Sequence, residues 1–327
     1  MLKFMNMKKK IISIISALIL AVCAVPFFSA CKKDDRPIIA VTVYPIYDWV
    51  SNVLGEKKDD FNLILLQDNG ADLHNYDPTS NDIGKIADSV LFIYVGGESD
   101  ERWTDRVFNA IGKEKAVINL LEVLGDNAVI EEEVGEEDHD HEHEEDHDHE
   151  EEYDEHVWLS LNNAKLFVTK IVEKLSKIDV ENAETYKNNA TGYVNLLDEL
   201  NEEYKTAVDG AEKKVIVVAD RFPFIYMTKD YGITYHAAFS GCSSDSAAST
   251  GTITRLVNAV LDNGLDAIFK LEGSDGRTAS SVKSGVGRDV KILTLDSMQT
   301  TTLKNGKGYL TAMRNNLDAL KIAFNVE

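Results

Sequence analysis

The chain has 327 residues, of which 34 are Lys or Arg and 56 are Asp or Glu, so that its formal net charge at pH 7 is −22. This length is enough for two domains of ordinary size. Proteins bind nucleic acid through clustered Lys and Arg, so we expect no nucleic-acid partner for so acidic a chain.

Residues 1–30 are predicted to be a lipoprotein signal peptide. Three consecutive lysines at 8–10 precede an apolar run over residues 11–25, and the small residues Ser29 and Ala30 stand directly before Cys31. This arrangement resembles the cleavage site of bacterial lipoproteins, with Cys31 as the lipidated residue. We therefore expect an exported protein that is anchored to the membrane by lipid.

Two alternatives to this cleavage site stay open. Phe28 is an unusual residue three positions ahead of the cysteine, and Cys23 is a competing candidate, although Val22 before it suits cleavage less well. The apolar run is also nearly long enough for an uncleaved membrane anchor. If Cys31 is lipidated, Cys242 is the only unmodified cysteine, which excludes an intramolecular disulfide.

A tether over residues 31–37 leads into a first predicted lobe, residues 38–178. Short runs rich in Val, Ile and Leu alternate here with helical patterns, as in a parallel sheet covered by helices on both faces. The predicted strands are Ile38–Val43, Asn62–Leu66, Val90–Val95 and Ala116–Asn119. The predicted helices are Tyr47–Leu54, Asn81–Ala87, Asp105–Ile111 and Ala164–Ile178.

Residues 131–155 interrupt this lobe with seventeen Asp or Glu, five His and no Lys or Arg. Because buried carboxylates need partners, the run is predicted to be a disordered, water-facing loop. Imidazoles and carboxylates both bind zinc, and the negative field concentrates divalent cations, so the loop is expected to capture metal. The alternative is a disordered acidic linker. Its histidines are His139, His141, His143, His147 and His149.

A long helix is predicted over residues 179–210, with Asp179 as its N-cap and with Tyr and Leu recurring at alternating steps of four and three. Such a helix between two sheet-like regions predicts a rigid strut between two lobes. The second lobe, residues 211–327, repeats the alternation of elements. Its predicted strands are Val215–Ala219, Ile233–Ala238, Ala267–Phe269 and Val290–Leu295, and its predicted helices are Phe224–Asp230, Ile253–Asn263 and Tyr309–Phe324.

Candidate metal ligands follow the predicted strands. Ligands of open α/β sheets bind beyond the carboxyl ends of the strands. Asp220, Glu272 and Asp296 each follow a strand of the second lobe, and His74 lies in a loop of the first lobe. His156 stands where the acidic run returns to apolar sequence, so ordered backbone can hold its imidazole. Each residue alone is compatible with an ordinary cap or surface position, but together they predict a metal site between the lobes.

Three segments carry a resemblance to a known family: residues 43–48 (VYPIYD), 70–79 (GADLHNYDPT) and 156–160 (HVWLS). With residues 179–186 and the last predicted helix, they make essentially the whole mature chain similar to the zinc/manganese solute-binding lipoproteins of ABC importers. The acid/His run lies where zinc-specific members carry theirs. The resemblance implies two α/β lobes joined by one long helix, with little lobe motion.

By this resemblance, His74 and His156 are the first-lobe metal ligands and Asp296 is a second-lobe ligand. The family's remaining ligand, a His or Glu, falls on Arg221, whose guanidinium has no lone pair to donate. Asp220, one residue earlier, is the preferred substitute.

Three further residues stay open as ligands or partners. His236 and Glu272 are reserves for the missing ligand, and His236 as a third nitrogen would favour zinc over manganese. Cys242 is a soft donor, although a single thiol in a Ser-rich loop is usually inert. Arg221 is alternatively expected to form a salt bridge with one of the candidate second-lobe carboxylates and to lower the pKa of that acid.

We therefore predict a monomeric receptor on the extracytoplasmic face of a bacterial membrane, which captures Zn²⁺ and delivers it to an ABC permease without catalysis. A manganese or iron receptor of the same fold is the alternative within this class. A zinc hydrolase is the alternative outside it, but no predicted helix carries a His-Glu-x-x-His motif and the chain has no Gly-x-Ser-x-Gly motif. A surface adhesin role is compatible with transport.

Overall fold

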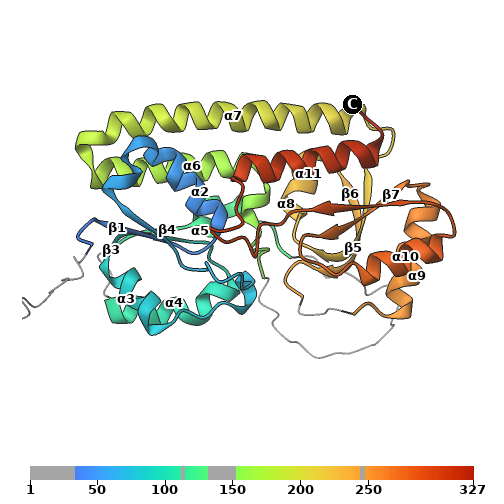
Figure 1. Ribbon diagram of the computed structural model, residues 1–327, viewed down its shortest axis with the longest axis horizontal. Coiled ribbons are helices and arrows are strands. Elements are labelled where there is room, and N and C mark those ends of the chain that lie inside the picture. The colour runs from blue at the N-terminus through green and yellow to red at the C-terminus, as the bar shows by residue number, and fades with distance from the viewer. Residues whose placement is uncertain (1–33, 112–114, 132–151, 244–246) are drawn as a thin grey trace, which may run out of the picture. The chain divides into compact units, whose positions relative to one another are not determined.

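The computed structural model describes residues 34–111, 115–131, 152–243 and 247–327. The predicted signal peptide, Cys31 and the five histidines of residues 139–149 lie outside this described part. Within it, no helix is both long enough and apolar enough to cross a membrane. Residues 37–327 form one unit, which contains both lobes (Figure 1).

The first lobe contains a sheet of four parallel strands in the order β2-β1-β3-β4. The strands are β1 (Ile38–Val41), β2 (Asn62–Leu65), β3 (Ser89–Tyr94) and β4 (Ala116–Asn119). The helices are α2 (Tyr44–Leu54), α3 (Ser80–Asp88), α4 (Glu98–Ile111), α5 (Leu120–Leu124) and α6 (Leu161–Ile178). Leu91 and Ile93 of β3 belong to one apolar cluster, whereas Phe92 and Tyr94 belong to another with Trp103 of α4. The sheet is therefore buried on both faces, as predicted.

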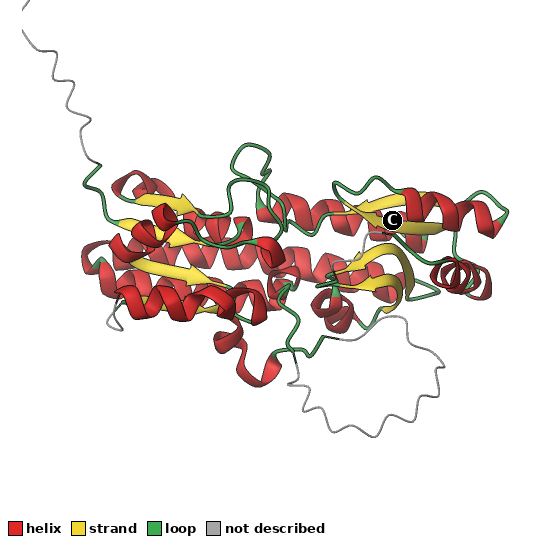
Figure 2. Ribbon diagram, turned by 90° about the horizontal axis from the view of Figure 1, so that it is seen from below, coloured by secondary structure: helices red, strands yellow, loops and turns green. Residues whose placement is uncertain are grey.

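The second lobe contains a second sheet of four parallel strands, in the order β6-β5-β7-β8. The strands are β5 (Val215–Phe222), β6 (Thr234–Ser240), β7 (Ala267–Leu271) and β8 (Lys291–Leu295), and the helices are α8 (Ile225–Tyr231), α9 (Thr250–Asp262), α10 (Arg277–Val286) and α11 (Tyr309–Phe324). Val217 of β5 packs with Leu256 of α9 and Val282 of α10, whereas its neighbours Ile216 and Val218 face the larger core. Figure 2 shows the two sheets in separate halves. The predicted fold class is confirmed.

The long helix α7 (Ala183–Gly210) runs along both lobes and contacts α2 and α6 of the first lobe and α11 of the second (Figure 1). Tyr204 of α7 donates a hydrogen bond to the carbonyl of Met313 in α11 at 2.5 Å. The predicted strut is therefore present, but Asp179 does not cap it. Residues 180–182 form the separate turn η5, and the Asp179 carboxylate accepts the Tyr186 hydroxyl at 2.6 Å.

Buried hydrogen bonds around residues 154–160 also join the two lobes. The Trp158 indole N–H donates to the carbonyl of Ser297 at 2.8 Å, and the Tyr309 hydroxyl donates to the carbonyl of Trp158 at 2.6 Å. The Tyr226 hydroxyl donates to the carbonyl of Asp154 at 2.9 Å. Because these groups are buried, separating the lobes here would leave unsatisfied polar atoms, which favours a nearly fixed arrangement of the lobes.

Candidate metal site

His74 stands on a short, well-anchored turn that follows β2. The turn η2 (Leu73–Asn75) is capped by Asp72, whose Oδ1 accepts the backbone N–H of His74 at 3.2 Å. The Arg102 guanidinium donates to the His74 carbonyl at 2.6 Å. The His74 imidazole is mostly buried, with 13% of the side chain exposed. Its position is therefore set by backbone contacts on both sides.

His156 is fully buried at the start of the turn η4 (Val157–Leu159). Asp154 Oδ1 accepts the backbone N–H of His156 at 2.8 Å and lies 3.1 Å from its Nδ1. Burial opposes the charged imidazole, but Asp154 outweighs it and raises the pKa of His156 above its ordinary value. Because Asp154 engages Nδ1, Nε2 is the ring nitrogen that faces the site.

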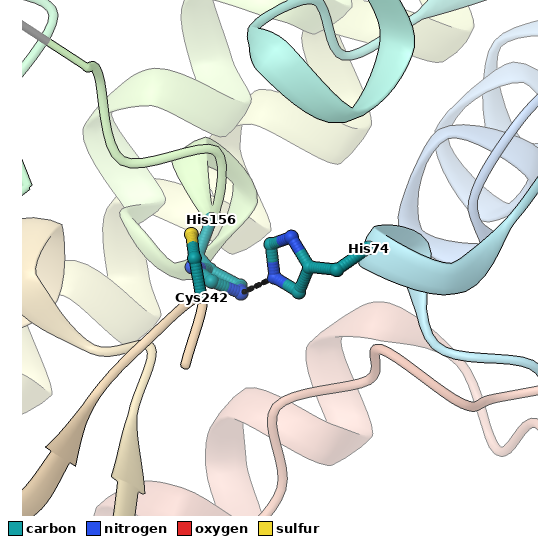
Figure 3. Close-up of side chains that lie close together, drawn as sticks. All are labelled: His74, His156 and Cys242. Atoms are coloured by element: carbon teal, nitrogen blue, oxygen red, sulfur yellow. Dashed lines mark hydrogen bonds between the residues drawn. The ribbon is translucent and has the colours of Figure 1, made fainter. Parts of the chain in front are cut away.

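The two imidazoles converge on one point, as Figure 3 shows: His74 Nε2 and His156 Nε2 lie 3.2 Å apart. Two nitrogens that bind one tetrahedral zinc at 2.0–2.1 Å are separated by roughly 3.3 Å. The Nδ1 of His74 lies 3.0 Å from Ser99 Oγ and 3.3 Å from Glu155 Oε2, which leaves Nε2 for an ion. The pair is therefore arranged to share one metal ion.

Asp154 and Glu155 differ from the predicted water-facing loop, because both are buried. Each is paired with an imidazole, and pairing is the condition under which burial of a carboxylate is tolerated. Burial opposes ionisation of Glu155, but the hydrogen bonds of His74 and of the Ser99 amide outweigh it and lower the pKa of Glu155. The site thus contains negative charge that attracts a cation.

Arg221 forms the predicted salt bridge, but with Asp72 of the first lobe rather than with a second-lobe carboxylate. Arg221 Nη2 lies 2.8 Å from Asp72 Oδ2. Burial opposes ionisation of Asp72, and the charge and hydrogen bond of Arg221 overcome this and lower the pKa of Asp72. Because a guanidinium has no lone pair to donate, Arg221 cannot itself be a metal ligand.

The other predicted donors are held within the second lobe. Asp220 accepts the amides of Arg221 and Leu271 at 3.0 and 3.3 Å, and Asp296 accepts the amide of Met298 at 2.9 Å. In the described residues, the one group of three or more His, Cys, Asp or Glu whose ligand atoms lie within 4.8 Å of one another is His74, His156 and Cys242.

The two reserve residues also lie outside this group. Glu272 accepts the amide and hydroxyl of Ser297 at 2.8 and 2.6 Å, and burial together with Asp296 raises the pKa of Glu272 to about 7. His236 lies within β6. The structure therefore brings together the two predicted first-lobe ligands, but not the second-lobe candidates.

Sequence reasoning missed Gln299, which is buried beside the histidines. In the orientation that satisfies its carboxamide, the NH₂ group lies 2.9 Å from Asp72 Oδ2 and the oxygen lies 2.9 Å from His156 Nε2. Its position three residues after Asp296, in the same strand-end loop, is the signal that was available. Gln299 thus links Asp72 to His156 Nε2, which donates to the Gln299 oxygen in the metal-free protein and would exchange this hydrogen bond for a metal ion.

A pocket of about 250 Å³ opens at His74 and is lined by both lobes. Its lining residues are His74, Asn75, Glu98, Ser99, Arg102, Glu131, Glu152, Tyr153, Glu155, Arg221, Cys242 and Ser243. Glu131 and Glu152 flank residues 132–151, and the Glu131 amide donates to the Glu152 carbonyl at 2.8 Å. Both ends of the acid/His segment are therefore attached at the entrance to the site.

Comparison with known proteins identifies the family of this chain. The family described as ZnuA, zinc-uptake complex component A, periplasmic, matches residues 39–323. The high-affinity zinc uptake system protein ZnuA of Bacillus subtilis is 32% identical over 294 residues, which cover 90% of this chain and 89% of that protein. The zinc-binding lipoprotein AdcA of Streptococcus pneumoniae is 32% identical over 315 residues, which cover 94% of this chain but only 60% of AdcA.

Solved structures show the same fold. The metal-dependent lipoprotein YcdH of Bacillus subtilis has a TM-score of 0.71 at 26% identity, covering 88% of this chain and all of that one. Zn(II)-bound AdcA of Streptococcus pneumoniae has a TM-score of 0.69 at 28% identity, covering 89% of this chain and 58% of that one.

Proposed function

Because this chain belongs to the family of periplasmic zinc-uptake components, we propose that it is the extracytoplasmic receptor that captures Zn²⁺ and delivers it to an ABC import permease. The observation that carries the proposal is the 3.2 Å separation of His74 Nε2 and His156 Nε2 in a mostly buried site. Two preformed nitrogen donors favour Zn²⁺, because Mn²⁺ prefers oxygen ligands. Mn²⁺ is the alternative cargo.

The site has the features of a receptor rather than of an enzyme. Asp154 and Glu155 are already engaged by His156 and His74, so neither is a free general base. Zinc hydrolases keep an open coordination position and such a base. We therefore propose binding and release without catalysis.

The ligand set is tested by metal titration of the mature chain, residues 31–327, with its five loop histidines replaced by Asn. We expect one Zn²⁺ per chain, and at least about a hundredfold weaker binding in His74→Ala and in His156→Ala. Asp77→Asn, at an exposed carboxylate paired with Arg106, is the control and should bind normally. Unchanged binding in both first-lobe variants would refute the proposed site.

Asp220 and Asp296 remain the predicted oxygen donors of the second lobe, with His236 and Glu272 in reserve. Titration of Asp220→Asn and Asp296→Asn in the same way shows whether each carboxylate binds zinc or only accepts hydrogen bonds from backbone amides. A true ligand should show at least a tenfold loss of zinc affinity with an unchanged thermal midpoint in the metal-free state.

We further propose that a lipid on Cys31 anchors a monomeric receptor to the membrane beside its permease. The relative named as a zinc-binding lipoprotein supports this proposal. In a bacterial host, Cys31→Ser should move the protein from the membrane fraction to the soluble fraction. Retention of the variant in the membrane would show that another segment anchors the chain.

A further inference from the structure

We propose that Cys242 is a third metal ligand, so that the receptor holds its ion through two imidazoles and one thiolate. This inference rests on the proposed function, because the ion is the receptor's cargo. A ring nitrogen of His74, a ring nitrogen of His156 and Cys242 Sγ all lie within 4.8 Å of one another. Figure 3 draws these three side chains close together. Sulfur and nitrogen on one tetrahedral zinc are roughly 3.5 Å apart, so a movement of roughly 1 Å completes the geometry.

The backbone of the cysteine loop packs directly against His156. A Cβ atom on Gly241 would lie 3.1 Å from His156 Cε1 and 3.0 Å from the carbonyl oxygen of Phe222. Glycine at this position therefore permits the close approach. The amide of Cys242 donates to Glu131 Oε1 at 2.9 Å, which holds the loop in place from its other side.

In this structure neither Arg221 nor Asp220 brings a ligand atom to the two histidines. The position expected for the third ligand holds Arg221, whose guanidinium is engaged by Asp72 and cannot ligate. The carboxylate of Asp220 accepts two backbone amides within its own lobe. Cys242 follows β6, the strand that neighbours β5, so it approaches the same end of the sheet as Arg221.

A thiolate ligand would also determine which metal is bound. Soft sulfur together with imidazole favours Zn²⁺, whereas Mn²⁺ prefers carboxylate and water oxygens. As the metal–sulfur bond forms, the S–H bond of Cys242 breaks and its proton passes to water. Cys242 would thus determine which metal the receptor prefers. It follows β6, whereas Arg221 lies in β5.

The test uses Co²⁺ as a spectroscopic probe of the mature chain, with Cys31→Ser and the five loop histidines replaced by Asn, so that Cys242 is its only thiol. One equivalent of Co²⁺ should produce visible bands of tetrahedral cobalt and a near-ultraviolet thiolate-to-cobalt charge-transfer band. Cys242→Ser should keep a weaker cobalt site through the histidines but lose the near-ultraviolet band. It should also bind Zn²⁺ at least tenfold more weakly, whereas Ser281→Ala, at an exposed position of α10, should behave like the parent.

Each contrary outcome has a separate meaning. Visible cobalt bands without the near-ultraviolet band in the parent would overturn the thiolate ligand and leave the receptor function intact. Unchanged zinc affinity and unchanged spectra in Cys242→Ser would overturn it as well. If the folded parent, checked by circular dichroism, bound neither Co²⁺ nor Zn²⁺, the proposed function itself would fail.

Discussion

Arg221 and Asp72 form an ion pair between the two lobes, with Nη2 and Oδ2 2.8 Å apart. Asp72 also caps the turn that bears His74, so the pair connects strand β5 to the backbone of a proposed metal ligand. The guanidinium places a fixed positive charge close to a site for a cation. Coulomb repulsion between the Arg221 guanidinium and the bound cation therefore weakens metal binding, although the ion pair with Asp72 holds the lobes together.

Replacing Arg221 by histidine should strengthen zinc binding by at least about tenfold, because it removes this charge and offers a nitrogen donor. Competition titration against a chromogenic chelator measures the effect. Arg221→Lys keeps the charge and is the matched control, with an affinity close to that of the parent. Equal zinc affinity in the two variants would contradict this account of Arg221.

Asp154 is predicted to act on the metal through His156. Its Oδ1 lies 3.1 Å from Nδ1 of the imidazole, so Asp154→Asn should weaken zinc binding by about 10- to 100-fold. The control is Asp77→Asn, because Asp77 is an exposed carboxylate paired with Arg106 in the same lobe. If calorimetry gave the same zinc affinity for both variants, the positioning role of Asp154 would be excluded.

Asp100 should make the metal-free protein less stable as the pH rises. Burial, reinforced by the charge of Glu155, raises the pKa of Asp100 from 3.8 to about 7. Since the folded state holds this proton more tightly than the unfolded state, the free energy of unfolding falls between about pH 4 and pH 7. Oδ2 of Asp100 accepts the amides of Val95 and Gly96, and the carboxamide oxygen of asparagine can accept the same two hydrogen bonds.

The unfolding free energy of Asp100→Asn relative to that of the parent is therefore expected to rise by about 2–3 kcal/mol between pH 5 and pH 8. Urea unfolding with a chelator present at both pH values measures the difference. Asp105→Asn, at an exposed position of the same helix, should show no such pH dependence. A constant difference between Asp100→Asn and the parent would exclude an ionisation of Asp100 in this range.

Removal of the acid/His segment should weaken zinc uptake only when zinc is scarce. The Glu131 amide lies 2.8 Å from the Glu152 carbonyl, so a two-residue Asn-Gly turn can replace residues 132–151 while both flanking glutamates are kept. We expect slower growth of the deletion strain with a chelator present and normal growth in zinc-replete medium. Equal growth of the deletion strain and the parent strain with the chelator would exclude the metal-collecting role. A variant with the five histidines replaced by Asn keeps the acidic residues, so it separates the contribution of the imidazoles from that of the negative charge.

The sequence alone predicted most of the elements, because each strand is a short apolar run and most helices show a clear apolar stripe. It missed α10, whose sequence is rich in Ser and Gly and buries only the small residues Ala279, Val282 and Val286, and it placed the start of α4 at Asp105 rather than at Glu98. The first turn of α4, residues 98–101, consists of Ser, Asp and Glu, which are also typical of loops. Local composition could not distinguish these cases from turns.

The sequence by itself determined the parallel α/β lobes, the long helix and the two histidines, because periodicity and short motifs are properties of neighbouring residues. Only the tertiary structure decided which groups surround those histidines. Arg221 meets Asp72 across 149 residues of chain, and Cys242 approaches His156 through a loop of the other lobe. Such contacts depend on how the two lobes dock and on which side chains are already engaged, and neither of these is encoded in the order of adjacent residues.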